Sequence, residues 1–440
     1  MKGDFSRITF DPFDRFSQVL MQQGRVQLDA DWNEQSAIVL HQVRSLARLL
    51  TGKYGGGSGF EIKPAAKKEE IVQIGPGIYY VDGILCENNA RPRCDAKVST
   101  LSYTTQSDYP FTDDERAVPP KPHADGKFLV YLDVWERQVT YLQHPSIRES
   151  ALPAGVDTAI RSQVVWHVAI SPEKVGTSAI PDFTDRATYD KNLTDEQRAK
   201  LTGCPTGPAP CLHAEVKDRG KAKTPCITPP ESGYRGSANQ LYRVEIHVTP
   251  GEPPMYKWSR ENGSVVFPID TRMTEISDSI KLMAKEKDSC GGGLRPGDWL
   301  EIEDESFTLH GRVRGLVKVK TYDPDNLLVH LDKAVNPAIQ MTGAKYPLVR
   351  RWDGAGVIPK GQATLENDIE IAFKPAPPDY RHGDYWLIAA RTSTGGIDWN
   401  KDEYRPAHRA PHYCAPLALI AIKADSSVDL VSDLRRIIDL

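Results

Sequence analysis

The chain has 440 residues, of which 40% are hydrophobic and 26% are charged, a balance that predicts a folded protein of two to four domains and excludes general disorder. A formal net charge of −4, without a long run of lysine and arginine, argues against a nucleic-acid partner. The longest apolar run, residues 415–422, is too short for direct membrane insertion. The first ten residues contain no apolar signal segment, so first residence in a cytoplasm is expected.

The first 59 residues form a distinct unit, which we interpret as an attachment arm and helix. Residues 1–29 should be extended or irregular, and a helix is expected over 31–50. Asp31 would cap the free N–H groups of this helix, and Glu34 would complete a capping box. Glycines at 55–57 and 59 then predict a flexible linker.

Apolar residues in the expected helix follow a heptad-like spacing. After Trp32 they recur at steps of seven, four, three and four residues, and we call the last four the seam: Val39, Val43, Leu46 and Leu50. Packing of the seam on the protein's own sheet is the plainer interpretation. Packing on copies of the same chain is the alternative.

The rest of the chain predicts a mainly β fold, with multi-domain β-sandwich and small-barrel modules behind the N-terminal arm and helix. A β domain is expected over 60–175, with strands at 71–74, 78–81, 128–135 and 163–170. A Cys/Pro-rich insertion or linker should occupy 176–235, with a short helix at 194–201. A second β domain should occupy 236–440, with strands at 242–248, 385–390 and 417–422, a hairpin turn at Asn262-Gly263 and a small barrel at about 290–335.

Two groups of residues have metal-compatible side chains, but neither has a convincing spacing. Cys204 and Cys211 are too far apart for a zinc knuckle with His213 and Cys226, and free or locally paired thiols are the preferred interpretation. Pro411 prevents a helical His408/His412 pair beside Cys414. The seven cysteines, an odd number in a long chain, do not predict a disulfide framework. We therefore predict no metal and no cofactor.

Glu301 and Glu303 are the one pair of carboxylates considered for catalysis. They would project from the same side of a predicted strand, as acid–base chemistry on a glycosidic bond requires. A solvent-facing acidic strand gives the same pattern more often. Phosphate-binding and nucleophile motifs are not found, so we expect a protein that is not an enzyme.

The segment Met1–Gln35 resembles the start of an uncharacterised bacterial family encoded beside baseplate genes of contractile phage-tail-like injection systems. The part VLMQQGRVQLDADWNEQ is similar to the attachment segment of phage tail-fibre and baseplate proteins. Four later blocks also resemble that bacterial family: Val134–Leu152, Gly233–His247, Lys257–Val266 and Gly383–Trp399.

The resemblance implies a structural component of a contractile phage-tail-like particle, in its baseplate, baseplate periphery, or spike cap or cage. The protein would be made in the bacterial cytoplasm and dock to baseplate or spike subunits, as a homo-oligomer with trimeric or sixfold symmetry. The implied docking residues are Phe5, Phe10, Phe13, Gln22, Gln23, Gly24, Arg25, Leu28, Asp31, Trp32 and Asn33. The seam would join copies of the chain.

Two other functions stay open at this point. A glycan- or receptor-binding tail-fibre module could use aromatic residues, such as Trp258, Trp386 and Trp399, to line a sugar site. A polysaccharide-degrading enzyme, which we consider the weaker alternative, could act through Glu301 and Glu303.

Overall fold

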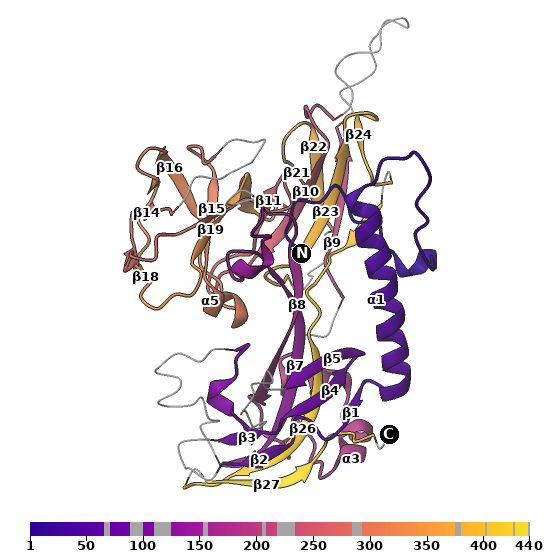
Figure 1. Ribbon diagram of the computed structural model, residues 1–440. Helices are drawn as coiled ribbons and strands as arrows, with labels where there is room; N and C mark the ends of the chain where they lie inside the picture. Colours follow the sequence, from indigo (N-terminus) through magenta and orange to yellow (C-terminus); the bar gives the residue numbers. More distant parts are fainter. Residues whose placement is uncertain are drawn as a thin grey trace, which may run out of the picture.

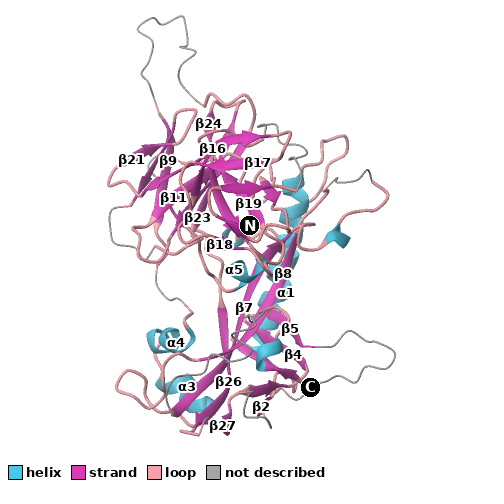
Figure 2. Cartoon of the chain, turned by 90° about the vertical axis from the view of Figure 1, so that its left-hand side faces the viewer, coloured by secondary structure: helices cyan, strands magenta, loops and turns pink. Residues whose placement is uncertain are grey.

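The computed structural model describes residues 1–65, 71–88, 100–109, 125–152, 157–204, 208–217, 234–283, 293–374, 380–400, 403–425 and 427–438. Antiparallel sheets form an upper and a lower part, and one long helix, α1 (Asp29–Thr51), runs along the side of the molecule between them (Figures 1 and 2). The mainly β fold class with several sheet modules and an N-terminal helix is therefore confirmed.

The lower part is built on a four-stranded sheet in the order β27–β26–β7–β8. Its strands are β7 (Gly126–Val139), β8 (Arg161–Ile170), β26 (Tyr413–Ile422) and β27 (Val428–Asp433). Two small sheets belong to the same part: β1 (Tyr54–Gly56), β4 (Gly77–Val81) and β5 (Ile84–Asn88), and β2 (Ile62–Pro64), β3 (Val72–Ile74) and β6 (Leu101–Ser102).

Strand β7 is apolar on both faces because both are covered. Val130 and Leu132 point into a core shared with the small sheets, while Leu129 and Tyr131 pack on the other side against two helices. These helices are α3 (Arg186–Asn192) and α4 (Asp195–Thr202). Short 3-10 turns lie at Pro12–Asp14, Tyr103–Thr105 and Pro145–Ile147. Burial on both faces explains the continuous apolar runs of β7 and β26.

The upper part contains a sandwich of two sheets around a core that includes Tyr242, Trp386 and Ile371. One sheet comprises β20 (Gly354–Val357), β11 (Met255–Ser259), β10 (Gln240–His247), β23 (Tyr385–Arg391) and β24 (Gly396–Ile397). The other comprises β21 (Gln362–Thr364), β22 (Ile369–Phe373), β9 (Cys211–Val216) and β25 (Tyr404–Pro406).

A third module has its own core and occupies more of the chain than the expected barrel at about 290–335. Its main sheet comprises β12 (Val266–Pro268), β19 (Leu348–Trp352), β15 (Trp299–Glu303), β16 (Val317–Asp323), β17 (Leu328–Leu331) and β14 (Ser279–Lys281). The pair β13 (Glu275–Ile276) and β18 (Ile339–Gln340), with the short helix α5 (Glu305–Leu309), completes it.

One local prediction is confirmed, and another is half right. Helix α4 begins after Thr194, whose hydroxyl forms a capping box with Gln197. Asn262 and Gly263 adopt φ of 50° and 65°, as the predicted turn requires. However, β11 pairs with β10 and β20, while β12 pairs with β19, so the two strands beside this turn do not form a hairpin. The turn instead carries the chain from one sheet to another.

The expected domain division stays a prediction, but the strand pairing crosses it at two places. Strands β26 and β27 belong to the expected 236–440 domain and pair with β7, which belongs to 60–175. Strand β9, within the expected insertion, pairs with β22 and β25.

A disulfide joins Cys204, after α4, to Cys414 on β26. The expectation of free or locally paired thiols is therefore wrong for Cys204, because the fold brings β26 back to this helix. Cys226 lies outside the described residues, and the Nδ1 atom of His213 lies 2.8 Å from the Glu403 carbonyl oxygen. Among the described helices, none is long and apolar enough to span a bilayer.

Candidate docking surface

Helix α1 begins two residues earlier than predicted, and it is not capped by Asp31. Its N-cap residue is Leu28, which makes no side-chain cap, and Asp31 lies in the first turn. The Glu34 carboxylate accepts a hydrogen bond from the Thr9 hydroxyl instead of closing a capping box. The predicted capping box is therefore wrong, because the preceding arm, residues 1–28, supplies the partner of Glu34.

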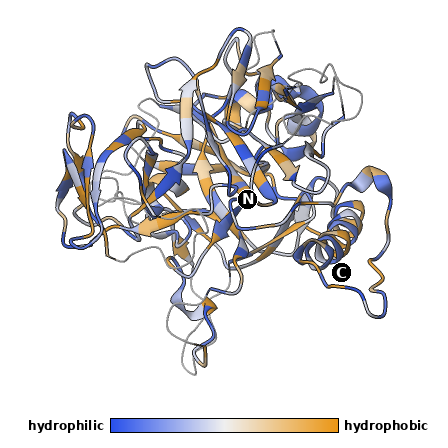
Figure 3. Ribbon diagram, turned by 90° about the horizontal axis from the view of Figure 1, so that it is seen from above, coloured by the Kyte–Doolittle hydropathy of each residue, from blue (hydrophilic) through white to orange (hydrophobic). Residues whose placement is uncertain are grey.

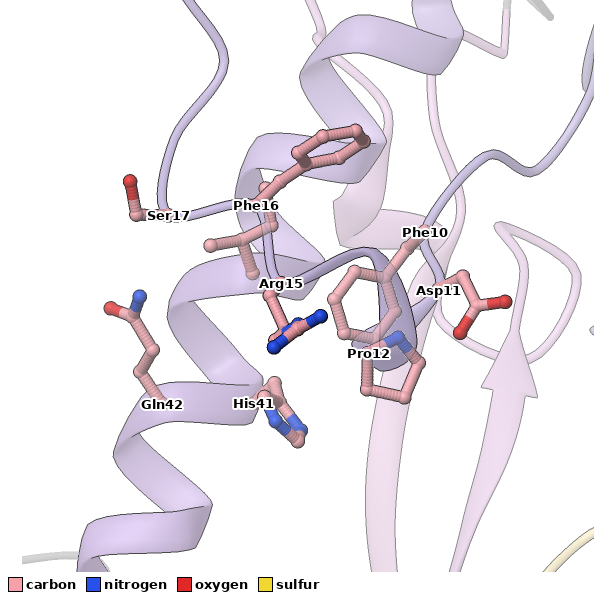
Figure 4. Close-up of a pocket in the computed structure, with 9 residues that line it drawn as sticks. Phe10, Asp11, Pro12, Arg15, Phe16, Ser17, His41 and Gln42 are labelled. Atoms are coloured by element: carbon pink, nitrogen blue, oxygen red, sulfur yellow. The ribbon is translucent and has the colours of Figure 1, made fainter.

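The arm lies along one stripe of α1. The Ser6 backbone N–H donates to Asp29 at 2.9 Å, and the Val19 N–H donates to the Gln35 side chain at 2.7 Å. The ring of Phe10 lies 5.7 Å from that of His41. A hollow of about 520 Å³, counting space open to solvent, lies between the arm and the helix. Its lining residues, drawn in Figure 4, are Phe10, Asp11, Pro12, Arg15, Phe16, Ser17, Ile38, His41 and Gln42.

A second stripe of α1 faces the rest of the protein, and it carries the charges. Arg44 donates two hydrogen bonds to Glu136 on β7, at 2.8 and 2.9 Å, and Arg48 pairs with Asp82 at 3.0 Å. Ala30 and Thr51 are buried on this side. On this stripe the helix therefore contacts the body of the protein through small and charged residues, whereas Ile38, which is buried, lies against the arm.

The seam lies on the third, outward stripe and is exposed at all four residues. The plainer interpretation, in which the seam packs on the protein's own sheet, is wrong in this structure, because the Arg44 and Arg48 ion pairs turn the opposite side inward. Seen from above, α1 lies at the edge of the molecule with the arm as a loop beyond it (Figure 3).

Exposed apolar side chains are concentrated in this region. Of the 25 large hydrophobic residues exposed in the described part of the chain, 15 lie within residues 1–50. Phe13 is 86% exposed, Val26 82% and Leu49 81%. Isolated exposed apolar residues are ordinary on a monomer, whereas a contiguous group of them usually marks an interaction surface.

Most of the predicted docking residues are accessible. Exposed are Phe13, Gln22, Gln23, Gly24, Arg25, Leu28, Trp32 and Asn33, whereas Phe5, Phe10 and Asp31 are half-buried. Gly24 has φ of 70°, and the Arg25 N–H donates to the Gln22 carbonyl, so these residues form a turn at the far end of the arm.

The start of the arm is anchored in the upper part by a buried network of charges. Lys2 lies within 4 Å of three carboxylates, those of Glu245, Glu301 and Glu303. The Asn262 side-chain amide donates to the Gly3 carbonyl at 2.9 Å. The turn predicted as a hairpin therefore holds the arm.

Lys257, on β11, lies at the centre of this network. Its fully buried ammonium group lies 3.1 Å from Glu245 and 2.6 Å from Glu301, and 4.4 Å from the centre of the Trp352 ring. Burial alone would raise the pKa of Glu301, but the ammonium groups of Lys257 and Lys2 hold that pKa well below its usual range. Glu301 therefore holds no proton to donate at neutral pH.

His247, Glu301 and His382 bring three possible metal ligands close together. The Lys257 ammonium lies among them, 3.4 Å from His247 Nδ1. This ammonium group therefore takes the place of a metal cation between these side chains. Burial, with Lys257 nearby, lowers the pKa of His247 to about 4. We assign this cluster to anchoring of the arm. Sequence reasoning selected Glu301 and Glu303 but missed Lys2 and Lys257, because nothing in the spacing links residues so far apart.

The tryptophans considered for a sugar site do not form an aromatic platform. Trp258 and Trp386 are buried in the sandwich core. Trp399 is half-buried, and its indole N–H donates to the Leu387 carbonyl at 3.2 Å.

The fold and this surface define a class of protein: a multi-sheet β protein that carries an exposed apolar arm and helix. The chain belongs to a family of unknown function, DUF6519, which matches residues 1–202 and 189–419. Comparison with curated proteins gave no match, and comparison with solved structures gave none.

Proposed function

We propose that this protein is a structural component of a contractile phage-tail-like particle and docks to baseplate or spike subunits through residues 1–50. One observation carries the docking part of the proposal: the apolar side chains exposed on the described surface are concentrated in these residues. The particle itself is suggested by two resemblances: that of Met1–Gln35 to the start of a family encoded beside baseplate genes, and that of Val19–Gln35 to attachment segments. The proposal assigns no catalytic step.

The arm is suited to docking because it is both exposed and held in place. Lys2, Ser6 and Val19 fix it at separate points, so little chain entropy would be lost when a partner covers it. Phe13, Phe16 and Leu20 lie between or beside these fixed points and present their side chains to solvent.

The test is incorporation of a surface variant into purified particles, measured by immunoblotting. In the variant, Phe13→Ser, Phe16→Ser and Leu20→Ser are combined, because these side chains are exposed and their loss should leave the fold intact. We expect at least a tenfold loss of incorporation. A control with Leu152→Ser, Met283→Ser and Val357→Ser removes three apolar side chains that are exposed elsewhere and should incorporate normally. Normal incorporation of the arm variant would refute the docking role.

A further inference from the structure

Helix α1 is divided into three stripes with different partners. Glu34, Gln35 and His41 meet the arm, and Arg44 and Arg48 meet the body of the protein. The third stripe carries the seam, in line with Trp32, and none of its large side chains is buried. From Trp32 to Leu50 this stripe is about 27 Å long.

The outward stripe carries no charge. The helix has five acidic or basic residues: Asp29 and Glu34 bind the arm, Arg44 and Arg48 form ion pairs, and Asp31 lies outside the stripe. The positions flanking the seam are also uncharged, being Asn33, Gln35, Leu40, Gln42, Ala47 and Leu49. An acidic, basic or phosphate-bearing partner would gain no electrostatic attraction from this stripe. An identical stripe on a second chain would meet no like-charge repulsion.

The spacing matches what a second copy of the same helix would present. Steps of four, three and four residues are those of alternating a and d positions, so each seam residue would enter a space between four residues of the facing helix. Ser36 occupies the a position next to Trp32, and its small side chain leaves room for a neighbouring indole. Its hydroxyl donates to the Trp32 carbonyl at 3.0 Å, so no polar group there would be left unpaired on burial.

We propose that α1 is a self-association element, in which the seams of identical chains pack in parallel as a short coiled coil. The inference deepens the proposed function and rests on it, since it names one partner of the docking region as another copy of this chain. The helix at the edge of the molecule leaves this face open to approach (Figures 1 and 3). The exposed arm beside it remains available to a different subunit.

The first test is the mass of the full-length protein in solution, measured by light scattering. The wild type should have a mass two or more times 49.0 kDa, and the Val43→Glu, Leu46→Glu variant should have the mass of one chain. Glutamate has a higher helix propensity than valine and about the same propensity as leucine, so the helix itself should not weaken. Val357→Glu, which places a charge at another exposed valine, should keep the wild-type mass. A monomeric wild type, or an unchanged mass in the seam variant, would overturn the proposal.

A second test does not depend on a disruptive variant. In a parallel coil, equivalent a positions approach closely enough for a disulfide. Val43→Cys should therefore form a covalent dimer on oxidation, whereas Ser45→Cys, exposed but off the seam, should not. Equal cross-linking at the two positions would contradict the proposed register. Mass and cross-linking test self-association, whereas incorporation into particles tests the proposed function. Either proposal can therefore be refuted while the other stands.

Discussion

Lys257 shows how strongly single residues determine the placement of the arm. No part of its side chain is exposed, and two carboxylates depend on it. Removing one member of a buried ion-pair network leaves the others charged without compensation, which costs far more than losing a surface pair. No sequence pattern marks Lys257, because a lysine in an alternating strand is ordinarily a solvent-facing residue.

The variant Lys257→Met should be strongly destabilised, because Glu245 and Glu301 would lose their central counter-charge. We expect a loss of about 3–5 kcal/mol in the free energy of unfolding, measured by urea titration. Lys333→Met, at an exposed lysine, is the matched control and should change stability by no more than about 0.5 kcal/mol. Similar losses in both variants would contradict the role of Lys257.

His247 should make stability fall in mild acid. Its pKa in the folded protein is about 4, compared with an ordinary value of 6.5, so between these values the unfolded chain binds a proton that the folded protein excludes. The contribution of His247 to stability is complete above pH 6.5 and falls as the pH drops toward 4, by roughly 3 kcal/mol in total.

The replacement His247→Asn should remove this part of the pH dependence. Asparagine keeps an acceptor for Lys257 but does not take up a proton. Urea unfolding at several pH values between 4 and 7 should therefore give a flatter profile than the wild type. Parallel profiles for the two proteins would show that His247 does not cause the acid sensitivity.

At the scale of elements, α1 shows what patterns predict and what they leave open. The heptad-like spacing predicted a helix with one apolar face, and the helix is there. Its orientation was not predictable, because it depends on Glu136 and Asp82, which come to Arg44 and Arg48 only in the folded chain. Likewise, the turn at Asn262 was predictable from its two residues, but the partner of each flanking strand was not.

The turn after β4 fixes how closely α1 approaches the lower part. Gly83 has φ of 81°, and a Cβ there would overlap the Arg44 carbonyl oxygen. Gly83→Ala should therefore displace α1, at a cost of about 2–3 kcal/mol in stability. Hydrogen exchange should show faster exchange in the second half of the helix.

Gly311→Ala separates the two causes of this loss of stability, which are backbone strain at a positive φ and steric overlap with α1. Gly311 also has a positive φ, 61°, but a Cβ there meets no atom within 4 Å. This control should show only the backbone penalty of about 1 kcal/mol. Equal effects at the two glycines would mean that close packing against α1 is not important.

At the scale of the whole molecule, the chain returns at its end to complete the sheet that it began near residue 126. Strand β26 lies between β7 and β27 and carries Cys414, which is bonded to Cys204. Sequence reasoning identified the individual strands from their apolar runs. It could not pair β26 with β7, because an apolar run predicts burial but not its neighbour.

The disulfide is a direct check of this topology. A non-reduced digest of the oxidised protein should yield a peptide pair linked through Cys204 and Cys414, identified by mass spectrometry. Cys204→Ser should abolish that pair. A linkage of Cys204 to Cys211, its near neighbour in sequence, would contradict the return of β26 to α4.

The pairing of β26 with β7 also sets an order of events during synthesis. Residues 1–51 precede every strand in the chain, and the sheet that carries Glu136 is incomplete until β26 and β27 have been translated. The exposed apolar stripe of α1 is therefore translated well before the complete sheet that supports the helix, a delay that favours aggregation of nascent chains.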